Sequence, residues 1–362
     1  MTSFLSELIR RRNFRDVPGY AAGMSEMRAS VLGAADVFQR LRGSINVGAV
    51  HAGARKPFRF LLCGDPALMS DLRALLLDGH GDAAFVPIDA AATLETIDPA
   101  AGRTLDTSDA RCVIFLARPG DRDGARVDLL TGLALPVLAL VVDPAVGASS
   151  GPAQAPAGGT ISDYVVSAIA LDTLEGRFLP HVIDCCRGIE IAVGRRLPAL
   201  RETVAAKLTR DAALNALKIA GASAVVDHIP FLGIVIGAFA TAGDMMALTG
   251  IQVMLMLQIG ATYGKDPDFA RVWELLPIVG GGLGWRALSR ELSGFIPVAG
   301  VLIKAAIAYA GTVVVGEGAR VYFQHGRHMS AADGAKLYED AKNSAMTFAR
   351  ETLAKLRRNR SN

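Results

Sequence analysis

Patterns that commonly reveal a nucleic-acid-binding protein are missing from this 362-residue chain. Its basic residues form no long run interleaved with aromatic side chains, and the formal net charge is only +3. Binding to nucleic acid depends on concentrated positive charge that neutralises phosphates. The composition therefore predicts no nucleic-acid partner.

Paired cysteine motifs and a secretory signal are missing too. The four cysteines, Cys63, Cys112, Cys185 and Cys186, do not have the spacing of a zinc site or a redox motif. Cys63 and Cys112 lie in apolar, strand-like runs, which favours buried thiols in a reducing compartment. Residues 1–14 contain no apolar core of the length that a secretory signal needs, so we expect the chain to start in the cytoplasm.

Short apolar runs alternate with helical patterns between residues 56 and 180. Continuous apolar strands separated by helices are typical of a parallel sheet with both faces covered, so an α/β domain is predicted. The expected strands are Phe58–Cys63, Phe85–Ile88, Cys112–Ala117, Val137–Val142 and Tyr164–Ala170.

The first of these strands ends at Gly64, and a helix is predicted over Ala67–Leu77. In a P-loop domain, the phosphate-binding loop lies between such a strand and helix. Counted from Gly64, the pattern puts Met69, Ser70 and Asp71 where glycine, lysine and Ser/Thr belong. The phosphate-binding lysine is missing, and a carboxylate replaces the magnesium-binding hydroxyl. Gly64 is therefore predicted to mark a degenerate phosphate loop.

The other GTPase motifs are also missing. Arg118-Pro119-Gly120-Asp121 follows the third predicted strand, where a GTPase has Asp-x-x-Gly. Asp143-Pro144 follows the fourth, where guanine recognition uses Asn-Lys-x-Asp; Asp143 is either a relic of that motif or a residue that ends a strand. Phosphoryl transfer has no visible source of positioning and charge neutralisation. No catalytic residue, cofactor-binding residue or metal ligand is predicted, and His325 and His328 fit a solvated basic linker better than a metal site.

Two segments in the second half, residues 229–263 and 295–316, are far more apolar than the rest. Asp244 and Lys304 are their embedded polar residues, and such residues inside a membrane usually face protein or water. The first segment fits two helices hinged at Gly243-Asp244, or one spanning helix followed by an amphipathic one. Alternatively, both segments are buried helices of a soluble bundle, in which Asp244 and Lys304 could pair.

The two apolar segments share a pattern, which predicts a duplicated helical unit. Ile229-Pro230-x-x-Gly233 in the first corresponds to Ile296-Pro297-x-x-Gly300 in the second. After them, a solvated helix is predicted from Ser330, where Ser330 and Asp333 have capping-box spacing. That helix ends in a basic stretch at residues 355–360.

Residues 200–327 resemble the YcjF-like family of unknown function, which is associated with GTPases. The similar pieces are Gly243–Gln252, Ala261–Gly264, Gly282–Arg286, Ile296-Pro297 and Lys304–Glu317. The resemblance implies a membrane-associated helical domain that follows a domain of GTPase-like origin. Because all three GTPase motifs depart from the active pattern in this sequence, the resemblance implies no nucleotide hydrolysis.

The expected organisation is a helical segment (1–55), a degenerate P-loop-GTPase-like α/β domain (56–180), an apolar helical domain (181–328) and a solvated helix with a basic tail (329–362). The expected partners are the lipid membrane and an unidentified protein, with self-association as one alternative. We expect a protein of the inner, cytoplasmic membrane, with both terminal regions in the cytoplasm. Four functions stay open: a membrane-associated scaffold or regulator, an unorthodox GTP-binding switch that acts in membrane remodelling, a soluble helical protein-interaction module, and a small channel or transporter.

Overall fold

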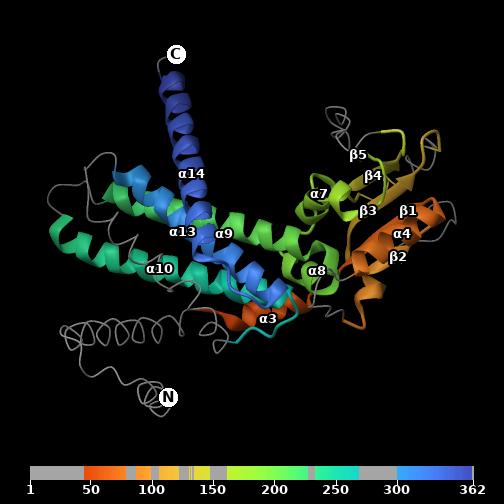
Figure 1. Cartoon of the computed structure of the whole chain (residues 1–362), viewed down its shortest axis with the longest axis horizontal. Helices are drawn as coiled ribbons and strands as arrows, with labels where there is room; N and C mark the ends of the chain where they lie inside the picture. Colours follow the sequence, from red (N-terminus) through yellow and green to blue (C-terminus); the bar gives the residue numbers. More distant parts are fainter. Residues whose placement is uncertain are drawn as a thin grey trace, which may run out of the picture. The chain divides into compact units, whose positions relative to one another are not determined.

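A parallel sheet of five strands forms the first half of the described fold. Neighbouring strands are all parallel, and their order across the sheet is β2-β1-β3-β4-β5 (Figure 1). This arrangement confirms the expected α/β class. The strands are β1 (Arg59–Gly64), β2 (Leu94–Thr96), β3 (Ala110–Ala117), β4 (Val137–Val142) and β5 (Ile161–Val166).

The computed structural model describes residues 45–78, 87–98, 106–121, 130, 132, 134–146, 161–226, 233–268 and 300–360. From Asn46 onward the chain is one structural unit, and Met1–Ile45 is another, of which only Ile45 is described. The helical segment predicted over residues 1–55 is thus visible only at its end, where α3 (Val47–Arg55) is helical.

The second strand differs from the prediction. The sequence favoured Phe85–Ile88, but β2 is Leu94–Thr96, which pairs with Phe60–Leu62 of β1. Phe85 lies outside the described residues, and Ile88 is a fully exposed turn residue rather than part of a strand. A three-residue edge strand with a glutamate at its centre has too few apolar positions to stand out from its surroundings.

Both faces of the sheet are buried, because successive side chains of a strand point to opposite sides. Phe60 and Leu62 of β1 belong to one apolar core, here called the first core, whereas Leu61 and Cys63 belong to a second. The second core also contains Leu130, from the connection between β3 and β4. This two-sided burial explains why β1, β3 and β4 read as continuous apolar runs.

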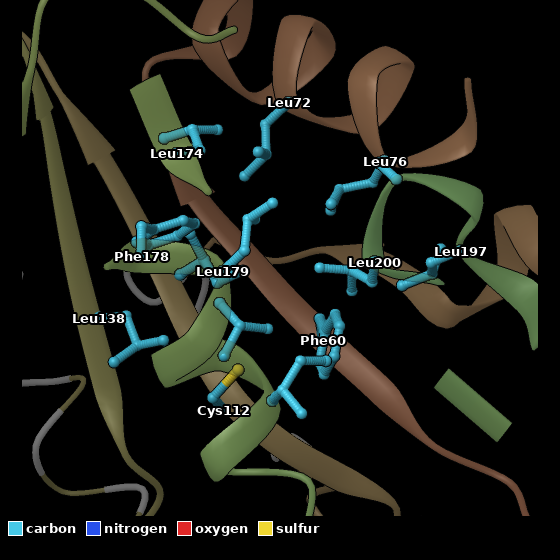
Figure 2. Close-up of a cluster of buried hydrophobic side chains, with 14 of the residues drawn as sticks. Phe60, Leu72, Leu76, Cys112, Leu138, Leu174, Phe178, Leu179, Leu197 and Leu200 are labelled. Atoms are coloured by element: carbon cyan, nitrogen blue, oxygen red, sulfur yellow. The ribbon is translucent and has the colours of Figure 1, made fainter. Parts of the chain in front are cut away.

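Helices cover the first core (Figure 2). Leu72 and Leu76 pack onto it from α4 (Pro66–Leu77), and Phe178 and Leu179 pack onto it from α7 (Phe178–Asp184). The core continues through Leu200 to Val204. The contributing helices are α4 (Pro66–Leu77), α6 (Leu171–Leu174), α7 (Phe178–Asp184), α8 (Glu190–Arg196) and the 3-10 turn η3 (Pro198–Leu200).

The described residues of the second half form four long helices: α9 (Arg201–Val226), α10 (Gly233–Thr262), α13 (Gly300–His325) and α14 (Ala331–Arg360). Helix α9 packs against both α10 and α13, and α14 packs against α13. Both copies of the predicted repeat are helical where they are described: Gly233–Ala238 lies in α10 and Gly300–Ala305 in α13. The predicted cap of α14 is confirmed, since the Asp333 amide donates to the Ser330 hydroxyl at 3.1 Å.

The first apolar segment is not hinged. Helix α10 runs unbroken through Gly243-Asp244, so the two-helix hairpin considered from the sequence is wrong. A single glycine costs a helix only about 1 kcal/mol relative to alanine, and strong helix formers follow it here. Among the described residues, no helix is both long and apolar enough to cross a membrane.

Candidate functional site

The candidate site lies at the carboxyl ends of β1 and β3. From β1 the chain crosses to β2 on one side, and β3 then lies on the other side of β1. The sheet therefore has its topological switch point between β1 and β3, where doubly wound sheets commonly bind ligands. The residues that follow these two strands, Asp65 and Arg118, define the site.

Gly64 permits a very tight connection from β1 into α4. Its φ of +115° lies in the region that favours glycine, and a β-carbon there would overlap the Leu116 carbonyl oxygen. That same oxygen accepts a hydrogen bond from the Asp65 amide at 2.9 Å. Only Asp65 separates the end of β1 from Pro66, the first residue of α4. The connection is therefore too short to form a phosphate-binding loop of the P-loop kind.

Asp65 caps the N-terminus of α4 with its own side chain. Its Oδ1 accepts from the Ala67 amide at 2.8 Å and from the Leu68 amide at 3.1 Å. The first helical residue is Pro66, which has no amide hydrogen to offer. The first backbone amides of a helix have no partner within the helix, so they and the helix dipole attract anions to its N-terminus. Here the protein's own carboxylate occupies the anion position.

Arg118 completes the site from the neighbouring strand. Its Nε donates to Asp65 Oδ2 at 2.9 Å, and the Asp65 side chain is only 20 % exposed. The Leu68 amide, followed by the Arg118 guanidinium, lowers the pKa of the Asp65 carboxyl below its ordinary value. The carboxylate therefore stays ionised at neutral pH, with its charge balanced by an arginine and a helix N-terminus.

Asp143, at the end of β4, is committed to a turn. Its amide donates to the Val166 carbonyl at 2.8 Å, and its Oδ1 accepts from the Ala145 amide at 2.9 Å. Such an Asx turn is a common way for an aspartate to end a strand. Of the two interpretations left open by the sequence, the strand-ending role accounts for this geometry.

The predicted candidates do not meet at one place. Gly64 lies at the switch point, whereas Asp244 and Lys304 belong to α10 and α13, and their side chains lie outside the described part of the structure. Their pairing stays a prediction. Sequence reasoning missed the Asp65–Arg118 pair, although opposite charges directly after two strands that flank a switch point were a usable signal.

Metal-ligating side chains do not gather in the described residues, where no group of three or more His, Cys, Asp or Glu side chains could hold an ion. Of the two histidines considered from the sequence, His328 stacks on the Tyr322 ring, with centroids 5.3 Å apart. His325 is an exposed residue at the end of α13.

The chain matches no protein-family model, and comparisons with curated proteins and with solved structures give no significant match either.

Proposed function

We propose that this protein is a non-catalytic scaffold or regulator that acts at a membrane. In its nucleotide-binding-like domain, the Asp65 carboxylate occupies the position at the α4 N-terminus where a phosphate would bind. One observation carries the non-catalytic part. Asp65 accepts hydrogen bonds from the α4 amides that a phosphate would need, and Arg118 neutralises that carboxylate.

A nucleotide phosphate at this position would have to displace Asp65 from Ala67 and Leu68 and break its ion pair with Arg118. The displaced carboxylate would then lie beside the incoming negative charge. Like charges at close range are unfavourable, and no lysine in the Gly64–Asp71 segment compensates for them. The switch point therefore has the strand order of a nucleotide-binding domain but not the residues that would bind a phosphate.

The strand order supports a nucleotide-binding ancestry as part of this proposal. The order β2-β1-β3-β4-β5 places the β1–α4 connection at the switch point, where doubly wound domains hold phosphates on a helix N-terminus. We retain the resemblance to the YcjF-like, GTPase-associated family on the same terms, because both copies of the repeated pattern, Gly233–Ala238 and Gly300–Ala305, lie in long helices, α10 and α13.

Calorimetric titration of the full chain with GTP and with ATP, each with Mg²⁺, tests the non-catalytic part. We expect no saturable heat for either nucleotide. Asp65→Ser provides a matched comparison, because serine still caps α4 but removes the negative charge. Saturable binding to the unaltered chain would overturn the proposal, whereas weak phosphate binding gained only by Asp65→Ser would support it.

Two features support the membrane part. The segment that becomes α10 is strongly apolar, and α14 carries Lys355, Arg357, Arg358 and Arg360 in its last turns. Basic residues near a membrane surface are each attracted by about 1 kcal/mol to anionic lipids. We therefore propose that the basic end of α14 binds an anionic lipid surface.

Flotation with phosphatidylcholine vesicles, with and without phosphatidylserine, tests the membrane part. We expect co-flotation that increases with phosphatidylserine and is weakened when the four basic residues of the α14 end become glutamine. The matched control replaces four exposed basic residues elsewhere by glutamine and should keep binding: Arg187, Lys265, Arg327 and Lys336. Equal loss in both variants, or no flotation at all, would contradict the proposal.

A protein-interaction module without a membrane is the second candidate. The end of α10 favours it, because Leu255, Met256 and Ile259 are fully buried within the protein. Helix α10 packs against α9 and α13, as in a helical bundle. Absence of flotation together with a defined, detergent-independent oligomer or complex would favour this candidate.

A further inference from the structure

The side of α14 that is buried near its middle continues as an apolar stripe toward the end of the helix. Ala341 and Ala345 are buried, and α14 packs against α13. Because an α-helix has 3.6 residues per turn, positions three and four apart lie on the same side. The side that holds Ala345 therefore also holds the apolar stripe, which consists of Phe348, Ala349, Thr352, Leu353 and Leu356.

Charge changes sign along the same helix. Residues 331–347 contain three carboxylates and two lysines, whereas residues 348–360 contain one carboxylate, Glu351, and five basic residues. The helical periodicity places Arg350 and Arg358 on the side opposite the apolar stripe, and Lys355 and Arg357 at its edges. The end of α14 is therefore apolar on one side and basic on the rest of its surface.

This charge pattern favours an anionic lipid surface over a second copy of the chain. Two apolar stripes packed face to face would bring Lys355 and Arg357, at the stripe edges, close to the same residues of the other copy. Like charges at close range are unfavourable. At a bilayer, the same basic residues can extend their charged heads to lipid phosphates while their hydrocarbon stems cover apolar surface.

We propose that the end of α14 lies in the plane of an anionic membrane surface and inserts its apolar stripe between the lipid headgroups. Amphipathic helices with basic polar sides bind in this way, through buried apolar area together with attraction to anionic lipids. The insertion rests on the membrane role proposed above for the basic end of α14, and it adds an apolar contact to the electrostatic one. Binding through the stripe differs from attraction of charges alone, because salt does not screen it.

Flotation of the full chain with vesicles of phosphatidylcholine and phosphatidylserine tests the insertion through paired substitutions. The double variant Leu353→Gln, Leu356→Gln removes two apolar side chains from the stripe, and glutamine is a good helix former. We expect its binding to weaken at least about tenfold, since burial of each leucine contributes to partitioning. The matched control, Thr347→Gln with Ala354→Gln, places two glutamines on the opposite side of the helix and should bind like the unaltered chain.

Salt separates the insertion from the electrostatic role on which it rests. In about 1 M salt the Debye length is only about 3 Å, so attraction between surface charges is largely screened. We expect part of the binding of the unaltered chain to persist there, and that of the leucine double variant to disappear. Binding of the unaltered chain that disappears completely in high salt would overturn the insertion alone. No flotation at low salt would overturn the insertion and the membrane role together.

Tryptophan fluorescence measures the depth of the stripe directly. Leu356→Trp adds an indole on the stripe and Ala354→Trp adds one on the opposite side, while both native tryptophans stay in place. With vesicles that contain brominated acyl chains, the quenching added by Leu356→Trp should exceed that added by Ala354→Trp. Equal quenching of the two variants would overturn the insertion.

The other possible occupants of the stripe give different results. A dimer of the unaltered chain in lipid-free solution that the leucine double variant loses would show that the stripe binds a second copy. A large fall in melting temperature without lipid, seen in the leucine double variant but not in its control, would show that the stripe packs within the protein. Either result would overturn the proposal, and unchanged oligomeric state and melting temperature in both variants are expected.

Discussion

Gly316 of α13 lies directly against the Thr209 side chain of α9. A β-carbon added at Gly316 would overlap the Thr209 hydroxyl and lie only 2.9 Å from the Thr209 Cβ. Real β-carbons do not approach other atoms so closely. The absence of a side chain at this one position therefore lets the two helices approach each other.

Replacing Gly316 by alanine should destabilise the protein by about 1–3 kcal/mol, because the added methyl overpacks the α9–α13 contact. Gly311 on the same helix is the matched control, since a β-carbon there would lie 3.9 Å from Gln252 Nε2, an ordinary contact. Gly311→Ala should stabilise by about 0.5–1 kcal/mol through helix propensity. Urea unfolding measures both; a similar effect of the two substitutions would show that the close approach does not hold in solution.

Gly64→Ala should cost about 3 kcal/mol or more, because strained backbone and a clash with the Leu116 carbonyl add together. Gly120 also has a positive φ, of +89°, but a β-carbon there would meet nothing within 4 Å. Gly120→Ala should therefore show the strain alone, about 1 kcal/mol. Chemical denaturation of both variants separates the two contributions. Equal costs would argue against the tight β1–α4 connection.

The charge of Asp65 should give the protein a pH-dependent stability. Its folded-state pKa is depressed, so its contribution is present above the unfolded value of about 3.9 and is lost as the pH falls through the folded value. Asp65→Asn keeps a capping oxygen but removes the charge. Its melting temperature should lie below that of the unaltered protein at pH 7, and the gap should close in acid.

The control for this experiment is Asp71→Asn, which removes an exposed carboxylate from the same helix α4. It should show no comparable gap at pH 7. High salt should also reduce the difference in melting temperature between Asp65→Asn and the unaltered protein, because salt screens both the ion pair with Arg118 and the helix dipole. A gap that stays constant from neutral pH into acid would show that charge plays no part at this site.

Tyr263 should make the protein sensitive to alkali. Its ring is buried, its hydroxyl donates to Gln324 Oε1 at 3.3 Å, and burial raises the pKa of the phenol. The stabilising effect of the protonated phenol is present below the unfolded pKa of about 10 and is lost as the pH rises beyond it. Tyr263→Phe should cost about 1 kcal/mol at neutral pH.

That cost should shrink above pH 10, because the phenylalanine variant has no proton to lose. Denaturant midpoints measured at pH 7 and above pH 10 check this prediction. Ultraviolet titration provides an independent reading, since the Tyr263 phenol should ionise later than an exposed tyrosine and Tyr263→Phe should reduce the late-ionising signal. A cost that does not depend on pH would show that Tyr263 ionises equally easily in the folded and unfolded chains.

The sequence predicts the sheet well where strands are buried on both faces. β1, β3 and β4 stand out because six or more mostly apolar residues run together, bounded by Gly64, Arg118 and Asp143. β2 does not stand out, because only Leu94 of its three residues is buried. An edge strand is specified mainly by its neighbour, through hydrogen bonds that composition does not encode.

The candidate site was only half predictable. Gly64 signals a constrained turn, and the absence of a lysine is visible by counting, so the absence of a P-loop motif after β1 follows from the sequence. The direction of the Asp65 side chain does not, because an aspartate before a helix can cap it or face solvent. Its partner Arg118 lies 53 positions away and is brought near only by the parallel pairing of β1 with β3.

Helix α9 contacts both the core beneath the sheet and the long helix α13. Val204 belongs to the first core beneath the sheet, and Thr209 on the same helix touches Gly316 of α13. Val204 and Thr209 are five positions apart on α9, which is roughly 7.5 Å along the helix axis. The helix is unbroken between these two contacts, so a tilt of α9 at its sheet end would also displace its contact with α13.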